Sequence, residues 1–535
     1  MAKMVNFYPV GIQTFSNIRE GNYLYIDKTQ YIVDFREKKM KYVFLSRPRR
    51  FGKSLLISTL ECYFQGKKEL FKGLAIEQLE KEWKQYPVFH IDFNGKDFTQ
   101  AGELEKTLLT FVEKQELIYG RDPLATTLGD RFMAVLRIAH EKTGLGAVVL
   151  IDEYDKPLLD VLDTGLKTFD SEGNERLLED RHREIMKGFY SVFKAADRDL
   201  KFVLLTGVTK FSQVSVFSGF NQPDDISMDD RYEALCGITE EELYSVFDEQ
   251  IKAMAARYKV SEDEMKYRLK RKYDGYHFSP SMLDIYNPFS LLNALDTQDL
   301  SCFWVSSGAT SMLPKFVDNM ELRLRNFEHC PILRKTLESS DVINGGAELF
   351  LYQTGYLTIK SSDEFGYFLG FPNQEVKQAL YEVVLPTLTM QSESDIISLQ
   401  SSLFRQLGTG EIADAMKTLK ALVADVPYSN KKLASMDMEE RYRLIISTIL
   451  NAIGLKVEVE HMLATGRIDL IAQTSRYIYV IELKLRNNGG KKAAMQQIQE
   501  NQYLEPFKAD KRKVIGLGIE LDEEGKGILD WGITS

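Results

Sequence analysis

The chain has 535 residues, of which 44% are hydrophobic and 27% are charged, and its formal net charge at pH 7 is −10. At roughly 150 residues per domain, this length predicts about three to four domains. The acidic balance argues against a surface coated with nucleic-acid-binding charge, although it leaves a local site open. Because the sequence has no long apolar run, no apolar N-terminal core and no CxxC pair, we expect no membrane helix, secretion signal, disulfide framework or simple zinc site. We therefore expect a multidomain cytoplasmic protein.

Strand-like and helix-like runs alternate through the first half of the sequence. Strands are expected at 41–46, 88–93, 146–155 and 201–209, with helices between them at 53–64, 103–117 and 130–142. This alternation implies a parallel sheet with crossover helices.

From about residue 239 the pattern becomes mainly helical, with helices at 240–258 and 262–273 and a helical scaffold without motifs over 300–430. After residue 429, a helix at 438–454 is followed by strands, a helix near 493–505 and a last strand at 513–519. This second pattern predicts a compact αβββαβ unit.

A candidate phosphate-binding loop lies in FLSRPRRFGKSLL, between a strand and a helix. In such loops backbone N–H groups hold phosphate, while Lys53 would reach the β and γ oxygens and Ser54 would bind Mg²⁺. Arg47 stands where the G-x-x-x-x-G-K-[ST] pattern has its first glycine, and Pro48 removes a backbone donor. The alternative is a solvated basic loop that caps a helix. The residues expected to hold nucleotide are Arg49, Arg50, Phe51, Gly52, Lys53, Ser54 and Asp152.

Two acids follow the apolar run VVLI. Asp152 would join the Mg²⁺ shell and Glu153 would polarise the attacking water. The alternative is an ordinary strand end that meets solvent, but Lys53 and Asp152 both fall at the carboxyl ends of parallel strands, where open α/β sheets bind ligands. Thr206 and Lys210 are candidates for sensing the γ-phosphate, although polar residues after a strand are common.

Several boxes together resemble the bacterial AAA-ATPase-like proteins: YPVGIQTF, YIDKT, SRPRRFGKSLL, VLIDEYDKPL and TGVTKFS, with CGITEEEL and YDGYHF further on. The resemblance covers most of the chain except about 300–430. It implies a P-loop ATPase domain and usually a C-terminal PD-(D/E)XK nuclease-like domain. The arginine at position 47 belongs to the usual RPRRFGK[ST] form of that family.

A second set of chemical groups lies near the C-terminus, in GRIDLIAQ and YIYVIELKL. Glu482 and Lys484 share one face of a strand, and Asp469 can lie beside them on its neighbour. Two carboxylates suit Mg²⁺, and the ammonium can assist attack on a phosphodiester, so these three residues are the catalytic candidates. The alternative is a common Glu–Lys pair on a half-exposed strand. However, the apolar YIYVI run indicates a central strand, in which burying a charged side chain is costly unless it has a partner or a function.

The resemblance also implies an acid on the helix before these strands, which Glu439 matches best and Glu440 second. It further matches Gln497 to a glutamine that follows the ExK strand, although a polar residue on an amphipathic helix is the simpler interpretation. His277 is expected to be a core or capping residue. Arg49 and Arg50 could contact phosphate or DNA, or act across a subunit boundary, and these alternatives stay open.

We therefore predict an α/β protein with a P-loop NTPase parallel-sheet domain (1–238), a mainly helical lid or linker (239–430) and a PD-(D/E)XK nuclease-like domain (431–535). The expected function is ATP binding and hydrolysis that controls a Mg²⁺-dependent nuclease acting on nucleic acid, with DNA favoured over RNA. The second hypothesis is a nucleotide-dependent switch or nucleic-acid-binding module that does not cut. A third makes the ATPase a signalling protein that oligomerises on ATP binding, which leaves a homo-oligomer open.

Overall fold

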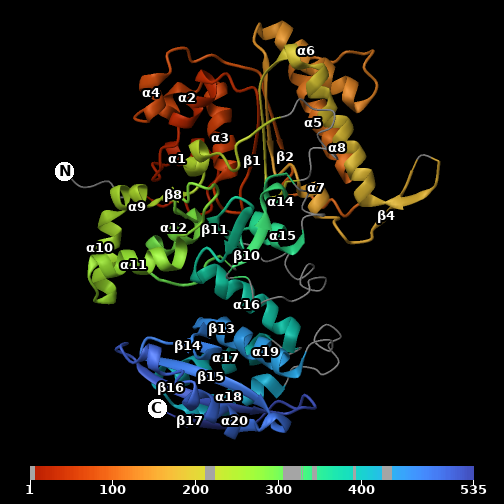
Figure 1. Cartoon of the computed structure of the whole chain (residues 1–535). Helices are drawn as coiled ribbons and strands as arrows, with labels where there is room; N and C mark the ends of the chain where they lie inside the picture. Colours follow the sequence, from red (N-terminus) through yellow and green to blue (C-terminus); the bar gives the residue numbers. More distant parts are fainter. Residues whose placement is uncertain are drawn as a thin grey trace. The chain divides into compact units, whose positions relative to one another are not determined.

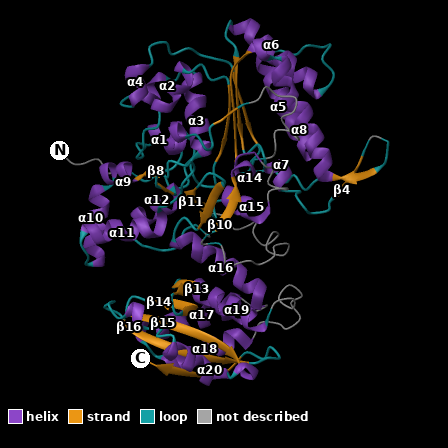
Figure 2. Cartoon of the chain, in the orientation of Figure 1, coloured by secondary structure: helices purple, strands orange, loops and turns teal. Residues whose placement is uncertain are grey.

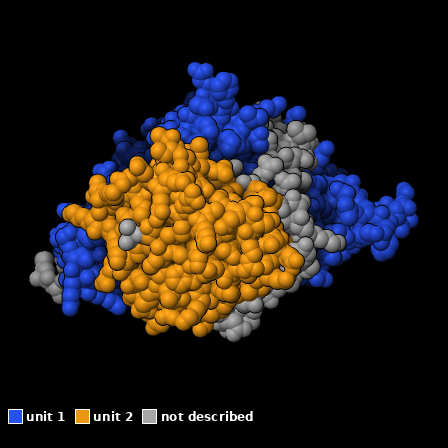
Figure 3. All heavy atoms as spheres, turned by 60° about the horizontal axis from the view of Figure 1, so that its bottom comes forward, with its two compact units in different colours: residues 1–303, 329–372 blue, residues 304–328, 373–535 orange. Residues whose placement is uncertain are grey.

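A computed structural model describes residues 7–170, 172–210, 223–304, 327, 329–339, 346–389, 393–424 and 437–534. The chain forms two compact units, coloured separately in Figure 3. The first comprises residues 1–303 and 329–372, and the second comprises residues 304–328 and 373–535. The first unit thus extends well past residue 238, whereas the three-domain division stays a prediction.

The first unit is built on a parallel five-stranded sheet with the order β2-β3-β6-β1-β7. Its strands are β1 (Tyr42–Ser46), β2 (Val88–Asp92), β3 (Ala147–Asp152), β6 (Leu200–Gly207) and β7 (Asp224–Asp225). Every residue of β1 and β3 is buried, as expected for strands covered on both faces. Four of the five strands, and their parallel pairing, confirm the prediction.

Helices cover both faces of this sheet (Figure 1). One side carries α1 (Phe15–Glu20), α2 (Gln30–Glu37), α3 (Lys53–Phe64) and α4 (Ala75–Leu79), and the other carries α5 (Glu103–Tyr119), α6 (Leu128–Thr143) and α8 (Leu178–Ala195). Between α7 (Lys156–Leu159) and α8, the short strands β4 (Lys167–Phe169) and β5 (Glu175–Leu177) pair into a hairpin that sequence analysis did not predict.

The next part of the first unit is mainly helical, with α9 (Glu240–Val246), α10 (Asp248–Tyr258), α11 (Glu262–Tyr273) and α12 (Pro288–Thr297). The single helix predicted at 240–258 breaks at Phe247, which is fully buried in the core that these helices share. The short strands β8 (Ile238–Thr239) and β9 (Ile285–Tyr286) pair at its edge.

A small antiparallel sheet interrupts the helical region and was not predicted. It contains β10 (Cys330–Leu333), β11 (Thr358–Ser362) and β12 (Gly366–Gly370) in the order β10-β12-β11, together with α14 (Arg334–Ser339) and α15 (Gly346–Thr354). Parts of the supposed scaffold at 300–430 lie outside the described residues.

The second unit contains α16 (Gln374–Thr389), α17 (Glu393–Thr409), α18 (Ile412–Ala424) and α19 (Met438–Ala452), followed by a five-stranded mixed sheet (Figure 2). The strands β13 (Lys456–Leu463), β14 (Gly466–Gln473), β15 (Tyr477–Leu485), β16 (Lys513–Leu521) and β17 (Ile528–Thr534) pair in sequence order, and α20 (Gly490–Glu500) joins β15 to β16. Only β15 and β16 run parallel. The αβββαβ order is confirmed, with β17 as an unpredicted addition. No helix among the described residues has the length and apolar character needed to cross a membrane.

Candidate active sites

The phosphate-loop candidate follows β1 and leads into α3, so the predicted strand–loop–helix arrangement is confirmed. Gly52 precedes the helix at a φ of 97°, a left-handed conformation that favours glycine. A β-carbon built on Gly52 meets nothing within 4 Å, so the backbone angle rather than crowding selects glycine here. Ser54 is half-buried in the first turn of α3.

Lys53 is buried and folded back against its own loop. Its Nζ donates to the carbonyl oxygens of Arg47 at 3.0 Å and Pro48 at 3.2 Å, and lies 3.9 Å from Oε1 of Glu153. Phosphate oxygens would compete with these carbonyl acceptors for the same ammonium.

Asp152 is the last residue of β3, which pairs with β6, and Glu153 follows it directly. Oδ1 of the buried Asp152 accepts hydrogen bonds from the Thr206 hydroxyl at 2.7 Å and from the Glu153 N–H at 3.0 Å. Thr206 therefore contacts the metal candidate Asp152 directly. Burial raises the pKa of Glu153, and the nearby Lys53 only partly offsets this effect. A carboxylate with a raised pKa accepts a proton more readily, which suits a group that polarises water.

Sequence analysis missed the role of Asp155, the last acid of IDEYD. Its buried Oδ2 accepts from the backbone N–H groups of Val208 at 2.9 Å and Thr209 at 2.6 Å, and from the Thr209 hydroxyl at 2.8 Å. These bonds tie the loop after β3 to the loop after β6. The sequence signal that could have identified Asp155 is a third acid so close to the end of an apolar strand. Lys210, by contrast, pairs with Asp225 on β7 at 2.7 Å.

The side chain of Arg47 anchors the loop. Its buried guanidinium donates to the carbonyl oxygens of Ser46 and Ser227 at 3.0 and 2.7 Å and of Tyr232 at 3.2 Å. It also stacks over Phe278, 4.2 Å from the ring centroid. The departure from the glycine pattern thus adds a structural link between the loop and the segment after β7.

Replacing Arg47 by Leu is expected to destabilise the fold by about 3 kcal/mol, because buried carbonyl oxygens lose their donor. The shift in urea-unfolding midpoint measures this effect. The matched control is Arg231→Leu, whose side chain is 62% exposed and should leave the midpoint unchanged. Equal midpoints for both variants would contradict the anchoring role of Arg47.

Two of the three side chains between Pro48 and Gly52, those of Arg50 and Phe51, lie against aromatic rings. Phe51 packs edge-on against Tyr276 and Phe278, with ring centroids 4.8 and 5.2 Å away, so its side chain belongs to the core. The Arg50 guanidinium lies over the Phe289 ring at 5.1 Å. His277 hydrogen-bonds the carbonyl of Ile359 and the carboxylate of Asp284.

An apolar cavity of about 110 Å³ opens beside Gly52. No sequence motif predicted it, because its walls come from segments far apart in the chain. They include Tyr25, Ile26, Leu55, Phe51, Cys236 and Ile238. An apolar cavity beside a phosphate loop is suited to a flat ring attached to the phosphates.

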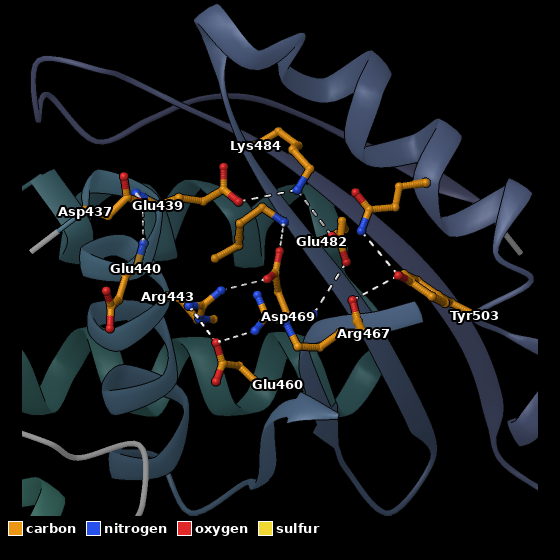
Figure 4. A network of polar contacts seen from close by, with 12 residues as sticks. Asp437, Glu439, Glu440, Arg443, Glu460, Arg467, Asp469, Glu482, Lys484 and Tyr503 are labelled. Carbon is orange, nitrogen blue, oxygen red and sulfur yellow. Dashed lines mark hydrogen bonds and ion pairs between the residues drawn. The ribbon is translucent and has the colours of Figure 1, made fainter. Parts of the chain in front are cut away.

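The C-terminal candidates lie together on β14 and β15 (Figure 4). Asp469 and Glu482 are adjacent on neighbouring strands, and the Asp469 N–H points to Oε2 of Glu482 at 3.5 Å. Their side chains are only 5% and 1% exposed. Oδ2 of Asp469 also accepts the Leu483 N–H at 2.9 Å. Two buried carboxylates therefore face each other in the centre of the sheet, as predicted from the spacing.

Lys484 lies between two of the acids. Its Nζ is 3.3 Å from Oε1 of Glu439 on α19 and 3.5 Å from Oε1 of Glu482. Glu440, one residue further along the helix, points away from Lys484 (Figure 4). Of the two helix acids considered, the structure brings Glu439 to the set.

The pKa values in this cluster reflect burial and crowded charge. Burial, and then the neighbouring Asp469, raise the pKa of Glu482 to about 8. Burial acts to lower the pKa of Lys484, but Glu439 and Glu482 outweigh it and raise the pKa. Glu482 is thus mostly protonated at neutral pH, whereas Lys484 keeps its charge.

Sequence analysis missed Arg443 on α19 and Glu460 on β13. Arg443 donates to Oδ1 of Asp469 and pairs with Oε1 of Glu460, both at 2.9 Å. Gln497 on α20 donates to the Tyr503 hydroxyl at 3.3 Å. The sequence signal for a role of Glu460 is the alternation of apolar and polar residues in KVEVEH. The same alternation is equally typical of an ordinary half-exposed strand.

The donor set is compatible with a divalent metal ion. Among the described residues no group of three or more His, Cys, Asp or Glu side chains is already arranged as a metal centre. Asp469 and Glu482, however, carry the hard oxygen donors that such ions prefer, and a divalent cation would relieve the repulsion by Asp469 that adds to burial in raising the pKa of Glu482. The buried pair therefore fits a metal whose remaining ligands come from water and substrate.

Comparison with known proteins identifies a family model for each of the two regions that carry the candidate residues. The family model described as "Predicted AAA-ATPase" matches residues 9–217, and the model described as "PD-(D/E)XK nuclease superfamily" matches residues 437–531. A protein of Azotobacter chroococcum, "Uncharacterized protein in vnfD 5'region", is 31% identical over 98% of both chains. The chain belongs to the AAA-ATPase-like family and ends in a PD-(D/E)XK nuclease superfamily domain.

The matched ranges separate the two sites within this AAA-ATPase-like protein. Lys53, Asp152, Glu153 and Thr206 fall inside the ATPase-like match. Asp469, Glu482 and Lys484 fall inside the nuclease superfamily match. The resemblance identified from RPRRFGKS and LIDEYDKP is therefore confirmed at the level of the family.

Proposed function

We propose that the first unit binds and hydrolyses ATP with Mg²⁺. The observation that supports this most is the convergence of Lys53, Asp152 and Glu153 at the carboxyl ends of β1 and β3, with Thr206 bonded to Asp152. Lys53 would exchange its carbonyl acceptors for phosphate oxygens, and Glu153 would take a proton from the attacking water. Bound Mg²⁺ would neutralise phosphate charge, with Ser54 and Asp152 holding its shell. The cavity beside Gly52 would receive the base.

We propose that the second unit hydrolyses nucleic-acid phosphodiesters, with DNA as the preferred substrate. Asp469 and Glu482 would hold a divalent metal, which would supply Lewis-acid activation of the phosphodiester and of the attacking water. Lys484 would orient or stabilise the attack, and Glu439 would fix the position of its ammonium at 3.3 Å. We further propose that the state of the nucleotide controls cutting, because one chain carries both modules and the Azotobacter relative aligns across both.

A second function, a nucleotide switch that binds nucleic acid without cutting, has one observation in its favour. Both oxygens of Asp469 already accept N–H bonds, one from Arg443 and one from Leu483. A site that never binds metal would keep this arrangement. The intact acid–acid–lysine set favours cutting, because a purely binding surface has no need to bury two carboxylates.

The deciding experiment measures cleavage of plasmid, linear and single-stranded DNA, and of RNA, with Mg²⁺ or Mn²⁺. Each substrate is tested with and without ATP, using wild type, Lys53→Ala and the double variant Glu482→Ala/Lys484→Ala. Cutting that depends on ATP or Lys53, and that disappears in the double variant, supports an ATP-controlled nuclease. ATP turnover without cutting of any substrate would support the switch instead. Sedimentation with and without ATP tests the homo-oligomer.

Metal binding should depend on pH, because Glu482 has a pKa of about 8 before the metal enters. Below that pH the metal must displace a proton, so we expect Mn²⁺ affinity to rise about tenfold per pH unit from 6 to 8 and to level off above 8. Calorimetry in buffers of different ionisation enthalpy would detect the released proton. An affinity that is flat from pH 6 to 8 would contradict Glu482 as a ligand.

The raised pKa of Glu482 also determines how this residue changes the stability of the metal-free protein with pH. The folded state keeps the Glu482 proton that the unfolded state loses near its ordinary pKa of 4.5. The contribution of Glu482 to stability is therefore fully present below pH 4.5 and is lost as the pH rises through about 8.

A further inference from the structure

Three acidic side chains lie in a row across neighbouring strands of the C-terminal sheet. Glu460 on β13 falls opposite Asp469 on β14, as the pairs on either side require, and Asp469 falls opposite Glu482 on β15. Like charges placed directly opposite in a sheet repel one another. The row therefore needs compensating positive charge, and α19 supplies part of it.

Arg443 spans the first two acids of this row (Figure 4). One guanidinium nitrogen lies 2.9 Å from Oδ1 of Asp469 and the other 2.9 Å from Oε1 of Glu460, with only 7% of the arginine side chain exposed. The backbone of Glu460 adopts a φ of 55°, which is uncommon for a residue other than glycine and especially so inside a strand. The local geometry is thus distorted at the residue that holds the far side of the guanidinium.

The two hydrogen bonds to Asp469 differ in how easily they can be given up. The Leu483 N–H belongs to the backbone of the buried central strand β15 and is fixed in place. Arg443 is a side chain with a second acceptor already in contact. A cation that approaches Asp469 therefore competes with Arg443 and leaves the Leu483 bond intact.

We propose that Arg443 is a positioning residue that occupies the metal-binding oxygen of Asp469 until a divalent cation enters, and that Glu460 then retains the displaced guanidinium. The proposal rests on the proposed role of Asp469 and Glu482 as metal ligands. It makes Glu460 part of the site although it lies on the far side of Arg443 from Glu482. Arg467, whose guanidinium is 3.2 Å from the same Glu460 oxygen, shares that acceptor and is half exposed.

The test is Mn²⁺ binding to the full-length protein without nucleotide, in an Asp152→Asn background that removes the acidic candidate ligand of the first unit's proposed metal site. Calorimetry and the paramagnetic resonance of free Mn²⁺ both report affinity without relying on cutting. We expect Arg443→Gln to bind Mn²⁺ about tenfold more tightly, because the competing cation is gone, and Glu460→Gln to bind about tenfold more weakly, because Arg443 loses its alternative acceptor. The double variant should match Arg443→Gln, since Glu460 acts through Arg443.

The opposite signs separate this role from simple structural support, which would weaken binding in both variants. Arg486→Gln is the matched control, because it removes one exposed positive charge of the same domain without contacting Asp469. If Arg443→Gln does not fold, Arg443→Lys replaces it. A lysine lacks the fork that holds two carboxylates, so this variant should bind Mn²⁺ more tightly than wild type.

The outcomes distinguish this inference from the proposed function. If Asp469→Asn abolishes Mn²⁺ binding while Arg443→Gln and Glu460→Gln shift it in the same direction, or not at all, the role of Arg443 is overturned and the metal site stands. If Asp469→Asn and Glu482→Gln leave Mn²⁺ binding unchanged, the metal site itself is overturned.

Discussion

Replacing Lys53 by Ala is expected to lower ATP turnover by about 10²–10³-fold, the usual cost of removing one fixed donor from developing negative charge. In the wild-type structure the ammonium is buried against two loop carbonyls and lies 3.9 Å from Glu153. This ammonium places a buried positive charge at the carboxyl edge of the sheet, beside Glu153. Without it, phosphate would lose its buried ammonium donor beside Glu153, so both affinity and turnover should fall.

The control for this prediction is Lys67→Ala, an exposed lysine just beyond the end of α3. Turnover by this variant should equal that of wild type. Equilibrium binding of a fluorescent ATP analogue separates the loss of affinity from the loss of chemistry. Wild-type turnover by the Lys53 variant would exclude this loop as the site of hydrolysis, whatever the activity of the second unit.

The parallel sheet could be predicted because β1, β3 and β6 each contain a continuous apolar run bounded by polar loops. The antiparallel additions could not be predicted in the same way. The last strand, ILDWGIT, mixes Asp, Gly and Trp and is only half-buried, so it carries neither a clear alternation nor an apolar run. The break at Phe247 could not be predicted either, because the apolar residues keep helical spacing on both sides of it. Only the burial of the Phe247 ring reveals the break.

The residues of the candidate sites likewise fall into a group that the sequence predicts and a group that it does not. Residues at strand ends and within one strand, such as Asp152 and Glu482, could be identified because spacing fixes their relation. Arg443 and Glu460 could not, since an arginine on a helix and a glutamate in an alternating strand are typical solvent-facing residues. Only the register of β13 against β14, and the packing of α19 over both, shows that these side chains meet above Asp469.

Replacing Glu482 by Gln should reduce nuclease activity by about 10³-fold, because charge stabilisation by a metal is worth several kcal/mol and each 1.4 kcal/mol is roughly a factor of ten. The same change should not weaken the metal-free fold. Glu482 is 1% exposed and its pKa is raised to about 8, so ionising it costs folding energy that a neutral glutamine avoids.

Activity and stability should therefore move in opposite directions in this variant. At pH 8–9 the metal-free Glu482→Gln protein should melt at or above the wild-type temperature, by calorimetry or circular dichroism, while plasmid cleavage is lost. The matched control is Glu458→Gln on β13, a more exposed acid that pairs with Lys456 and His461 and lies outside the acidic row. A Glu482 variant that loses activity only together with stability would assign this carboxylate to the fold. A stable and inactive variant would place it in the chemistry, because a buried acid that costs the fold energy needs some other reason to be there.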